Sequence, residues 1–243
     1  MHDVILNLGC GTKTSDHPNV VNIDWSISLR IKKNPVLRAF LPLLLNQERR
    51  SRIAKDLGKI VVHDLSKGLP YADGSISVVY HSHLLEHIER NKAETFLSEN
   101  LRVLKRGGIL RVVVPDFEQL CRKYLASLES GLSTSTVEHE THIADIIEQC
   151  VRVEAFGTSK QRQPRRFLEN LLLGNARKRG ETHQWMYDKS TLTNLLKKIG
   201  FGSVSICEFN ASQIDHWNEI GLDLDSNGMQ YKPFSLYVEA MKI

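Results

Sequence analysis

Two glycines and two aspartates follow short apolar runs near the start of the 243-residue chain. Gly9 and Gly11 end the run at residues 4–8, and Asp24 and Asp64 end the next two runs. Glycine lets the backbone turn sharply and approach a ligand, because no Cβ stands in the way. One carboxylate accepts hydrogen bonds from both hydroxyls of a ribose, and another accepts from an adenine amino group. These glycines and aspartates at the ends of three successive runs therefore predict an adenosine-like ligand.

The elements that position these residues are strands with little polar alternation, which is typical of a parallel sheet buried on both faces. Helical periodicity separates several of them, as at 84–104, and Asp188 and Gly200 are expected to cap and end a helix at 190–199. This alternation predicts a doubly wound α/β fold, in which strand ends meet at one carboxyl edge. The expected strands are 4–8, 20–24, 60–65, 76–80, 109–115, 204–209 and 234–241.

Composition and charge are those of an ordinary globular protein, with 41% hydrophobic and 25% charged residues and a net charge of +4. No apolar stretch approaches the roughly 20 residues that span a bilayer, and no signal pattern opens the chain. The cysteines are scattered and have no paired spacing, which predicts reduced thiols. We therefore expect a cytoplasmic protein. The cysteines are Cys10, Cys121, Cys150 and Cys207.

The domain organisation predicted is one domain over 1–243, with helical or lid insertions at about 26–58 and 121–182. The first insertion is basic and interrupted by proline. It is either a crossover helix with a solvated basic face or an amphipathic segment in weak contact with a membrane surface. The second insertion has helical patterns at 137–153 and 167–178, and we expect it over the carboxyl edge of the sheet.

Three other motifs suggest different sites. Residues 83–87 spell H-x-x-E-H, an inverted zinc-protease motif, but no third ligand is evident and we predict no metal. A dinucleotide site requires a third glycine where Thr14 stands. Residues 223–228 open like a calcium loop, but Phe234 replaces the glutamate that such a loop needs, so a tight turn is the simpler interpretation.

Five motifs, in order, resemble class I S-adenosylmethionine-dependent methyltransferases, and most closely the small-molecule group called type 11. The resemblance covers residues 4–116 and implies a Rossmann-like fold of seven strands with the last antiparallel. It also implies S-adenosyl-L-methionine as cofactor. The short link at 12–19 departs from the family's usual first crossover helix. The motifs are L-N-L-G-C-G at 6–11, N-I-D at 22–24, H-D-L at 63–65, L-L-E-H-I at 84–88 and L-R-V-L-K-R-G-G at 101–108.

The resemblance also implies which residues hold the cofactor. By analogy, the two glycines hold the methionine end, Asp24 the ribose and Asp64 the adenine. The complete set expected at the cofactor is Leu8, Gly9, Cys10, Gly11, Asp24, Asp64, Leu65, His81 and Ser82.

The expected reaction is methyl transfer to a hydroxyl, with an amine as second choice, of a small polar acceptor such as a sugar or glycan precursor. A hydroxyl must lose its proton, so we look for a base near neutral pH. The candidates for this chemistry are His83, His183, His81 and Asp116. Two alternatives stay open: a nucleic-acid methyltransferase, which the mild charge disfavours, and an inactive S-adenosylmethionine-binding protein.

Overall fold

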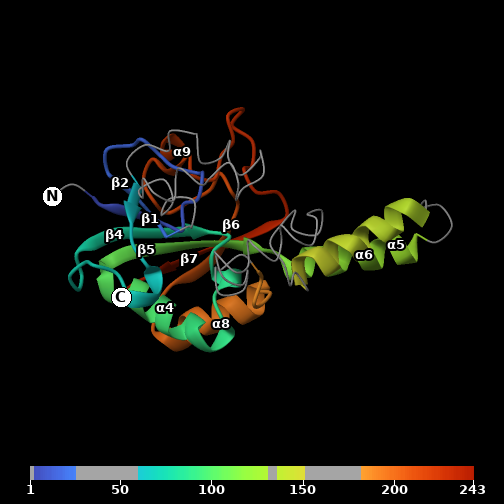
Figure 1. The fold of residues 1–243 in the computed structure, drawn as a ribbon, viewed down its shortest axis with the longest axis horizontal. Helices are drawn as coiled ribbons and strands as arrows, with labels where there is room; N and C mark the ends of the chain where they lie inside the picture. Colours follow the sequence, from blue (N-terminus) through green and yellow to red (C-terminus); the bar gives the residue numbers. More distant parts are fainter. Residues whose placement is uncertain (1–2, 26–59, 131–135, 151–181) are drawn as a thin grey trace, which may run out of the picture.

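The computed structural model describes residues 3–25, 60–130, 136–150 and 182–243, and its centre is one seven-stranded sheet (Figure 1). The strand order is β3-β2-β1-β4-β5-β7-β6. The strands are β1 (Ile5–Leu8), β2 (Val20–Asp24), β3 (Ile60–Val62), β4 (Ile76–Ser82), β5 (Leu104–Pro115), β6 (Val204–Cys207) and β7 (Ser235–Met241). Strands β1 to β5 pair in parallel, whereas β7 is antiparallel to both β5 and β6. This arrangement confirms the predicted fold class.

Helices cover both faces of the sheet. In Figure 1, α4 and α8 lie on one face and α9 lies on the other. The helical elements are η1 (Leu65–Lys67), η2 (Leu85–His87), α4 (Arg90–Val103), α5 (Phe117–Glu129), α6 (Thr136–Cys150), α8 (Lys189–Ile199) and α9 (Trp217–Ile220), where η denotes a 3-10 helix. Two buried apolar clusters fill the layers, one on the α4 and α8 side and one around Trp217. The sheet is thus buried on both faces, which its apolar strands require.

The helix expected at 84–104 is shorter than predicted and does not end at the paired glycines. Ile88 and Glu89 are extended, with ψ of 133° and 135°, and they separate η2 from α4. Leu104 is also extended, and β5 begins there and runs through Gly107, whose φ is 74°. The glycines therefore bend a strand and do not cap the helix. The helix at 190–199 is confirmed, with Asp188 as its N-cap and Gly200 left-handed at φ 113°.

The second insertion begins with a helix that the sequence analysis did not identify. Asp116 caps α5 by accepting a hydrogen bond from the Gln119 backbone N–H at 3.3 Å. Helix α6 lies where a helix was expected at 137–153, and α5 and α6 extend away from the sheet in Figure 1. The helix expected at 167–178 and the insertion at 26–58 fall outside the described residues, so both stay predictions. No helix in the described ranges is long and apolar enough to cross a bilayer.

Candidate functional site

The glycine turn after β1 has the backbone that only glycine adopts easily. Gly9 and Gly11 have φ of 63° and 53°, in the left-handed region. A Cβ on Gly9 would lie 2.8 Å from Cδ1 of Leu84, which precedes η2. The left-handed conformation therefore favours glycine at both positions, and at Gly9 any larger residue would also have to displace the Leu84 side chain. The turn after β1 and the segment after β4 are in direct contact.

Asp24 lies beside this turn, as predicted from the strand ends. Its Oδ2 accepts a hydrogen bond from the Gly11 N–H at 2.8 Å, and its side chain is buried. The Cys10 N–H donates to the carbonyl of Ile23 at 3.2 Å, which joins the ends of β1 and β2. Burial raises the pKa of the Cys10 thiol, with a contribution from the Asp24 charge, so Cys10 is not a nucleophile at neutral pH.

Asp64 lies at the next strand end, beside an apolar cavity. Its Oδ1 accepts hydrogen bonds from the Ser66 N–H at 3.1 Å and the Ser66 hydroxyl at 2.7 Å, which caps η1. A cavity of about 320 Å³ opens between η1 and the start of α4. Its apolar lining includes Leu65, Leu84 and Phe96. An apolar slot next to a carboxylate has the chemistry that an adenine ring needs.

His81 is the most deeply buried of the candidate bases. Its side chain is 0% exposed, and its ring lies 5.3 Å from that of Phe96 between centroids. Neither ring nitrogen has a hydrogen-bond partner among the described residues. Burial lowers the pKa of His81 to about 3. An uncharged, enclosed imidazole has no route to an acceptor in this conformation. Ser82, the next residue, is half-buried.

His83 stands at a sharp bend after β4, with φ of 51°. Its Nε2 is 2.8 Å from the Ser235 hydroxyl, and its Nδ1 is 3.4 Å from Oε1 of Glu86. Burial, together with the nearby positive charge of Lys232, lowers the pKa of His83 to about 3. His83 is therefore neutral at physiological pH, and it is a weak base.

His183 packs against His87, which lies four residues after His83. Its ring packs edge-on against that of His87, with centroids 4.7 Å apart and an interplanar angle of 83°. One ligand atom from each of Glu86, His87 and His183 falls within 4.8 Å of the others. We call these three residues the Glu86 cluster. The structure thus brings together a carboxylate and two imidazoles from segments far apart in the sequence.

Backbone hydrogen bonds hold the two segments of this cluster together. The N–H groups of Gln184 and Trp185 donate to the carbonyl of Glu86, at 2.6 and 3.3 Å. The Phe117 N–H donates to the carbonyl of Tyr187 at 3.1 Å, which fixes the same segment to the end of β5. The segment at 182–187 is therefore anchored along the carboxyl edge of the sheet.

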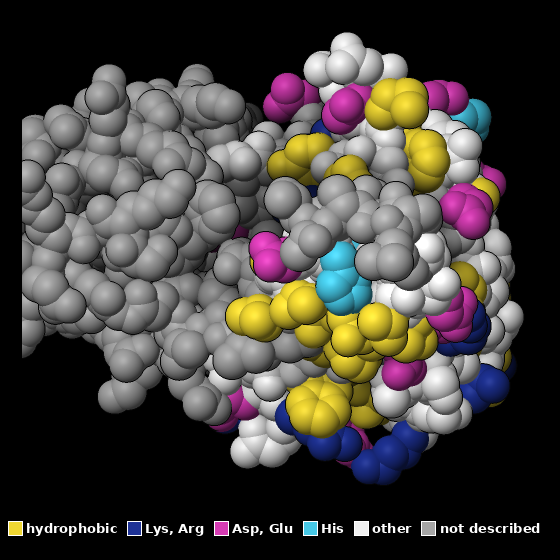
Figure 2. All heavy atoms as spheres, turned by 90° about the vertical axis from the view of Figure 1, so that its right-hand side faces the viewer, with side chains coloured by type: hydrophobic (Ala, Val, Ile, Leu, Met, Phe, Trp, Pro, Cys, Tyr) yellow, Lys and Arg dark blue, Asp and Glu magenta, His cyan; other side chains and the backbone are white. Residues whose placement is uncertain are grey.

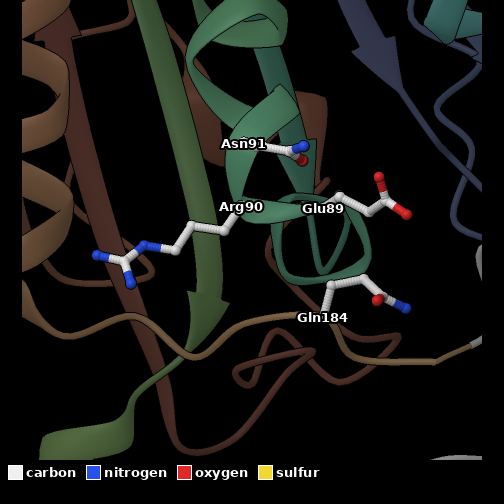
Figure 3. A pocket seen from close by; sticks show the side chains of 4 residues that line it. All are labelled: Glu89, Arg90, Asn91 and Gln184. Atoms are coloured by element: carbon white, nitrogen blue, oxygen red, sulfur yellow. The ribbon is translucent and has the colours of Figure 1, made fainter.

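A polar cavity of about 610 Å³ lies beside the Glu86 cluster, lined by Glu89, Arg90, Asn91 and Gln184. In Figure 3, the side chains of Glu89, Asn91 and Gln184 point to the same side, and Arg90 points the other way. The guanidinium carbon of Arg90 stacks 4.0 Å from the ring centroid of Trp185. Figure 2 shows a face of the molecule on which hydrophobic side chains gather around a histidine. The cavity can accommodate a polar molecule the size of a sugar.

Asp116 lies at the N-terminus of α5 and not in the Glu86 cluster. It caps α5, its backbone pairs with Tyr187, and burial raises the pKa of its carboxyl group. It borders the segment that carries His183, but its carboxylate is already used as a helix cap.

Sequence reasoning gave no role to Glu86 and His87. Their signal was the H-x-x-E-H spacing, which we set aside because a third ligand was not evident. His183 supplies a third group, and only the tertiary structure brings it to η2. The calcium-like segment is a tight turn, as expected: the Gly228 N–H donates to the Asp225 carbonyl at 3.2 Å.

Comparisons with known proteins agree with the geometry. The family model described as "Methyltransferase domain" matches residues 42–112, which include β4, η2 and α4. No curated protein sequence matches the chain.

Several solved structures are similar to the chain. A SAM-dependent methyltransferase from Archaeoglobus fulgidus is 14% identical with a TM-score of 0.45, covering 99% of this chain and 86% of that one. A possible histamine N-methyltransferase from Thermotoga maritima is 16% identical with a TM-score of 0.43, covering 99% and 82%. The DszA carbon methyltransferase is 13% identical with a TM-score of 0.43, covering 99% and 47%. These similarities are distant.

Residues 42–112 are thus similar to a methyltransferase domain, and they contribute strands to a seven-stranded sheet of order β3-β2-β1-β4-β5-β7-β6 with a glycine turn after β1.

Proposed function

We propose that the protein transfers a methyl group from S-adenosyl-L-methionine to a hydroxyl oxygen of a small polar acceptor, such as a sugar or glycan precursor. The observation that supports this proposal best is the polar cavity beside the Glu86 cluster. A hydroxyl acceptor needs hydrogen-bonding groups to orient it and a group that promotes loss of its proton. The cavity offers the first, and the cluster offers the second.

The residues proposed to hold the cofactor lie along the ends of β1, β2 and β3. We assign the methionine end to the turn at Gly9 and Gly11, and the ribose hydroxyls to Asp24, whose carboxylate lies beside that turn. Asp64 and the apolar slot at Leu65 and Leu84 suit the adenine. S-adenosyl-L-methionine supplies an activated methyl group on a sulfonium when it is bound. The protein's main task is then alignment and exclusion of water.

We assign the promotion of proton loss to the Glu86 cluster and not to His83 or His81. The pKa of each of these two histidines is lowered to about 3, so they accept a proton poorly at neutral pH. His183 is half-buried, and Gln184, one residue later, lines the polar cavity. His183 is therefore the candidate of the original four that best combines access with proximity to the acceptor.

The first experiment measures cofactor binding by calorimetry with S-adenosyl-L-methionine. We expect one molecule bound per chain, and a loss of affinity in the Asp24→Ala variant. The matched control is Asp225→Ala, because Asp225 lies in the exposed turn near 228. Absence of binding by the wild-type protein would contradict the proposed activity. Binding without any methyl transfer would favour an inactive binding protein.

The second experiment identifies the acceptor. Labelled S-adenosyl-L-methionine is offered with nucleotide sugars, glycan precursors and RNA, and methyl incorporation is measured for each. We expect incorporation into a sugar-containing small molecule. Incorporation into RNA alone would overturn the proposed acceptor while leaving the methyltransferase assignment in place.

A further inference from the structure

We propose that Glu86, His87 and His183 bind one divalent transition-metal ion at the acceptor side of the site. The binding itself stands on the geometry of these three residues. Its role in catalysis rests on the function proposed above. The three residues come from η2 and from the segment at 182–187, which are joined by hydrogen bonds from Gln184 and Trp185 to the Glu86 carbonyl.

The distances among the three side chains are close to those of a bound metal. One ligand atom from each lies within 4.8 Å of the others. Zinc-like ions bind histidine nitrogen and carboxylate oxygen at about 2.0–2.2 Å, so bound ligand atoms lie within roughly 4 Å of one another. A small inward movement of the side chains is enough to reach these distances.

The hydrogen bonds of both histidines indicate which ring nitrogen carries the proton. Nδ1 of His87 lies 3.2 Å from the Thr182 carbonyl oxygen, and Nδ1 of His183 lies 2.7 Å from the Gln149 carbonyl oxygen. A carbonyl oxygen only accepts, so each Nδ1 must carry the proton and donate it. In the neutral ring, each Nε2 then has a lone pair. Metal-binding histidines almost always show this pairing of Nδ1–H with a carbonyl or carboxylate.

The carboxylate is held in a similar way. Glu86 is 0% exposed, and Nδ1 of His83 lies 3.4 Å from its Oε1. His83 is then a positioning residue that orients Glu86.

Two imidazoles and one carboxylate form a donor set for Zn²⁺, Mn²⁺, Co²⁺ or Fe²⁺. Three protein ligands leave coordination positions open, as in catalytic zinc sites. We infer that the acceptor hydroxyl takes an open position, where the cation lowers its pKa. The hydroxyl loses its proton to water, the new O–CH₃ bond forms as the S–CH₃ bond breaks, and the products are the methyl ether, S-adenosylhomocysteine and one proton.

The test is metal binding by purified full-length protein that has been stripped with chelator. Zn²⁺, Mn²⁺ and Co²⁺ are titrated by calorimetry, and the visible absorption of the Co²⁺ form is recorded. We expect about one ion per chain. His183→Gln, His87→Gln and Glu86→Gln should each weaken binding by more than the roughly 10–100-fold typical of losing an outer residue, and His83→Ala should fall within that range.

The matched control is His216→Ala. His216 also faces a glutamate three residues later, with Nδ1 2.9 Å from Oε1 of Glu219, but this pair is exposed and has no third ligand among its described neighbours. The His216→Ala variant should bind the metal ion with the same affinity as the wild-type protein. Circular dichroism of each variant separates lost ligands from lost folding. Wild-type protein that binds no metal, or a His87→Gln and His183→Gln pair that both bind normally, would overturn the proposal.

Binding of S-adenosyl-L-methionine is measured on the same samples. Cofactor binding without metal binding would contradict the metal site alone and leave the methyltransferase assignment intact. Metal binding without cofactor binding would contradict the proposed function and leave the metal site standing. The two proposals therefore fail in different ways.

Discussion

Two polar clusters lie at the sheet, and they contain different kinds of side-chain groups. Arg111 of β5 is fully buried and pairs with Asp223 and Glu239, each at 2.7 Å. Tyr80 and Trp217 also donate to Asp223, at 2.7 and 2.8 Å. We call this group the Arg111 network. The Glu86 cluster instead brings one carboxylate oxygen and two imidazole nitrogens within 4.8 Å of one another.

The difference separates a structural role from a binding role. In the Arg111 network, every charge meets an opposite charge or a donor from the chain itself. Arg111 also donates to the carbonyls of Glu208, Phe209 and Ala211, which fixes the loop after β6 to the sheet. In the Glu86 cluster, the groups that converge are those that we propose as ligands for a cation. A buried cluster that is complete stabilises the fold, whereas one that gathers acceptors is suited to bind.

The largest effect is expected from removing the cation of the Arg111 network. Arg111→Met leaves two buried carboxylates without their counter-charge, which should lower the free energy of unfolding by about 3–5 kcal/mol. Denaturant unfolding measures this value. Lys198→Ala breaks an exposed ion pair with Glu94 and should cost about 0–1 kcal/mol. Equal losses in the two variants would erase the distinction between buried and exposed pairs. If Arg111→Met does not fold, Asp223→Asn tests the same network.

The second-largest effect is the change in stability when a metal ion is added, which we expect to depend on the Glu86 cluster. A metal at 100 times its dissociation constant should stabilise the wild-type protein by about 2.7 kcal/mol, because only the folded state binds it. The Glu86→Gln variant should gain much less. Thermal unfolding with and without Zn²⁺ measures both values. A similar gain in both proteins would place the metal elsewhere.

A third effect distinguishes Asp24, a buried carboxylate that we assign to the cofactor. Replacing it by alanine should weaken S-adenosyl-L-methionine binding by about 10–100-fold, since a charged acceptor is lost. Calorimetry measures this change. Glu239→Gln, in the Arg111 network, should alter stability and leave the affinity for the cofactor within about two-fold. Reversed effects in the two variants would exchange the roles that we assign to these carboxylates.

The smallest effect at neutral pH is expected from buried histidine, whose contribution appears only as the pH falls. The pKa of His81 is lowered to about 3 by burial, so the unfolded chain binds a proton below its usual pKa of about 6.5 and the folded chain does not. Stability should therefore fall as pH drops from about 6.5 towards 3, by up to about 1.4 kcal/mol per pH unit for this one group. His81→Leu should reduce that slope. An unchanged slope would show that His81 titrates normally in the folded protein.

His216 gives the opposite sign and is the control for this measurement. Its hydrogen bond to Glu219 raises its pKa. Its contribution is thus present below the unfolded pKa and is lost as pH rises through the folded one. His216→Ala should leave the acid side of the stability curve with the wild-type slope.

Most of the fold could be predicted from local sequence. The apolar runs identified all seven strands of the described sheet, and Asp188 and Gly200 marked both ends of α8. The boundaries around 84–104 were wrong, because the extended conformation of Ile88 and Glu89 depends on packing after β4 and not on helical periodicity. Helix α5 was missed even though Asp116 and Gln119 have the spacing of an N-cap.

The sequence alone was enough to predict the residues that we propose for the cofactor. Gly9, Gly11 and Asp24 lie at strand ends, and parallel strands bring their ends to one edge in a predictable order. Only the tertiary structure decided the Glu86 cluster. His183 reaches His87 because backbone hydrogen bonds anchor the segment at 182–187 against η2. Contacts between residues so distant in sequence depend on the packing of whole elements, which local patterns of side chains do not encode.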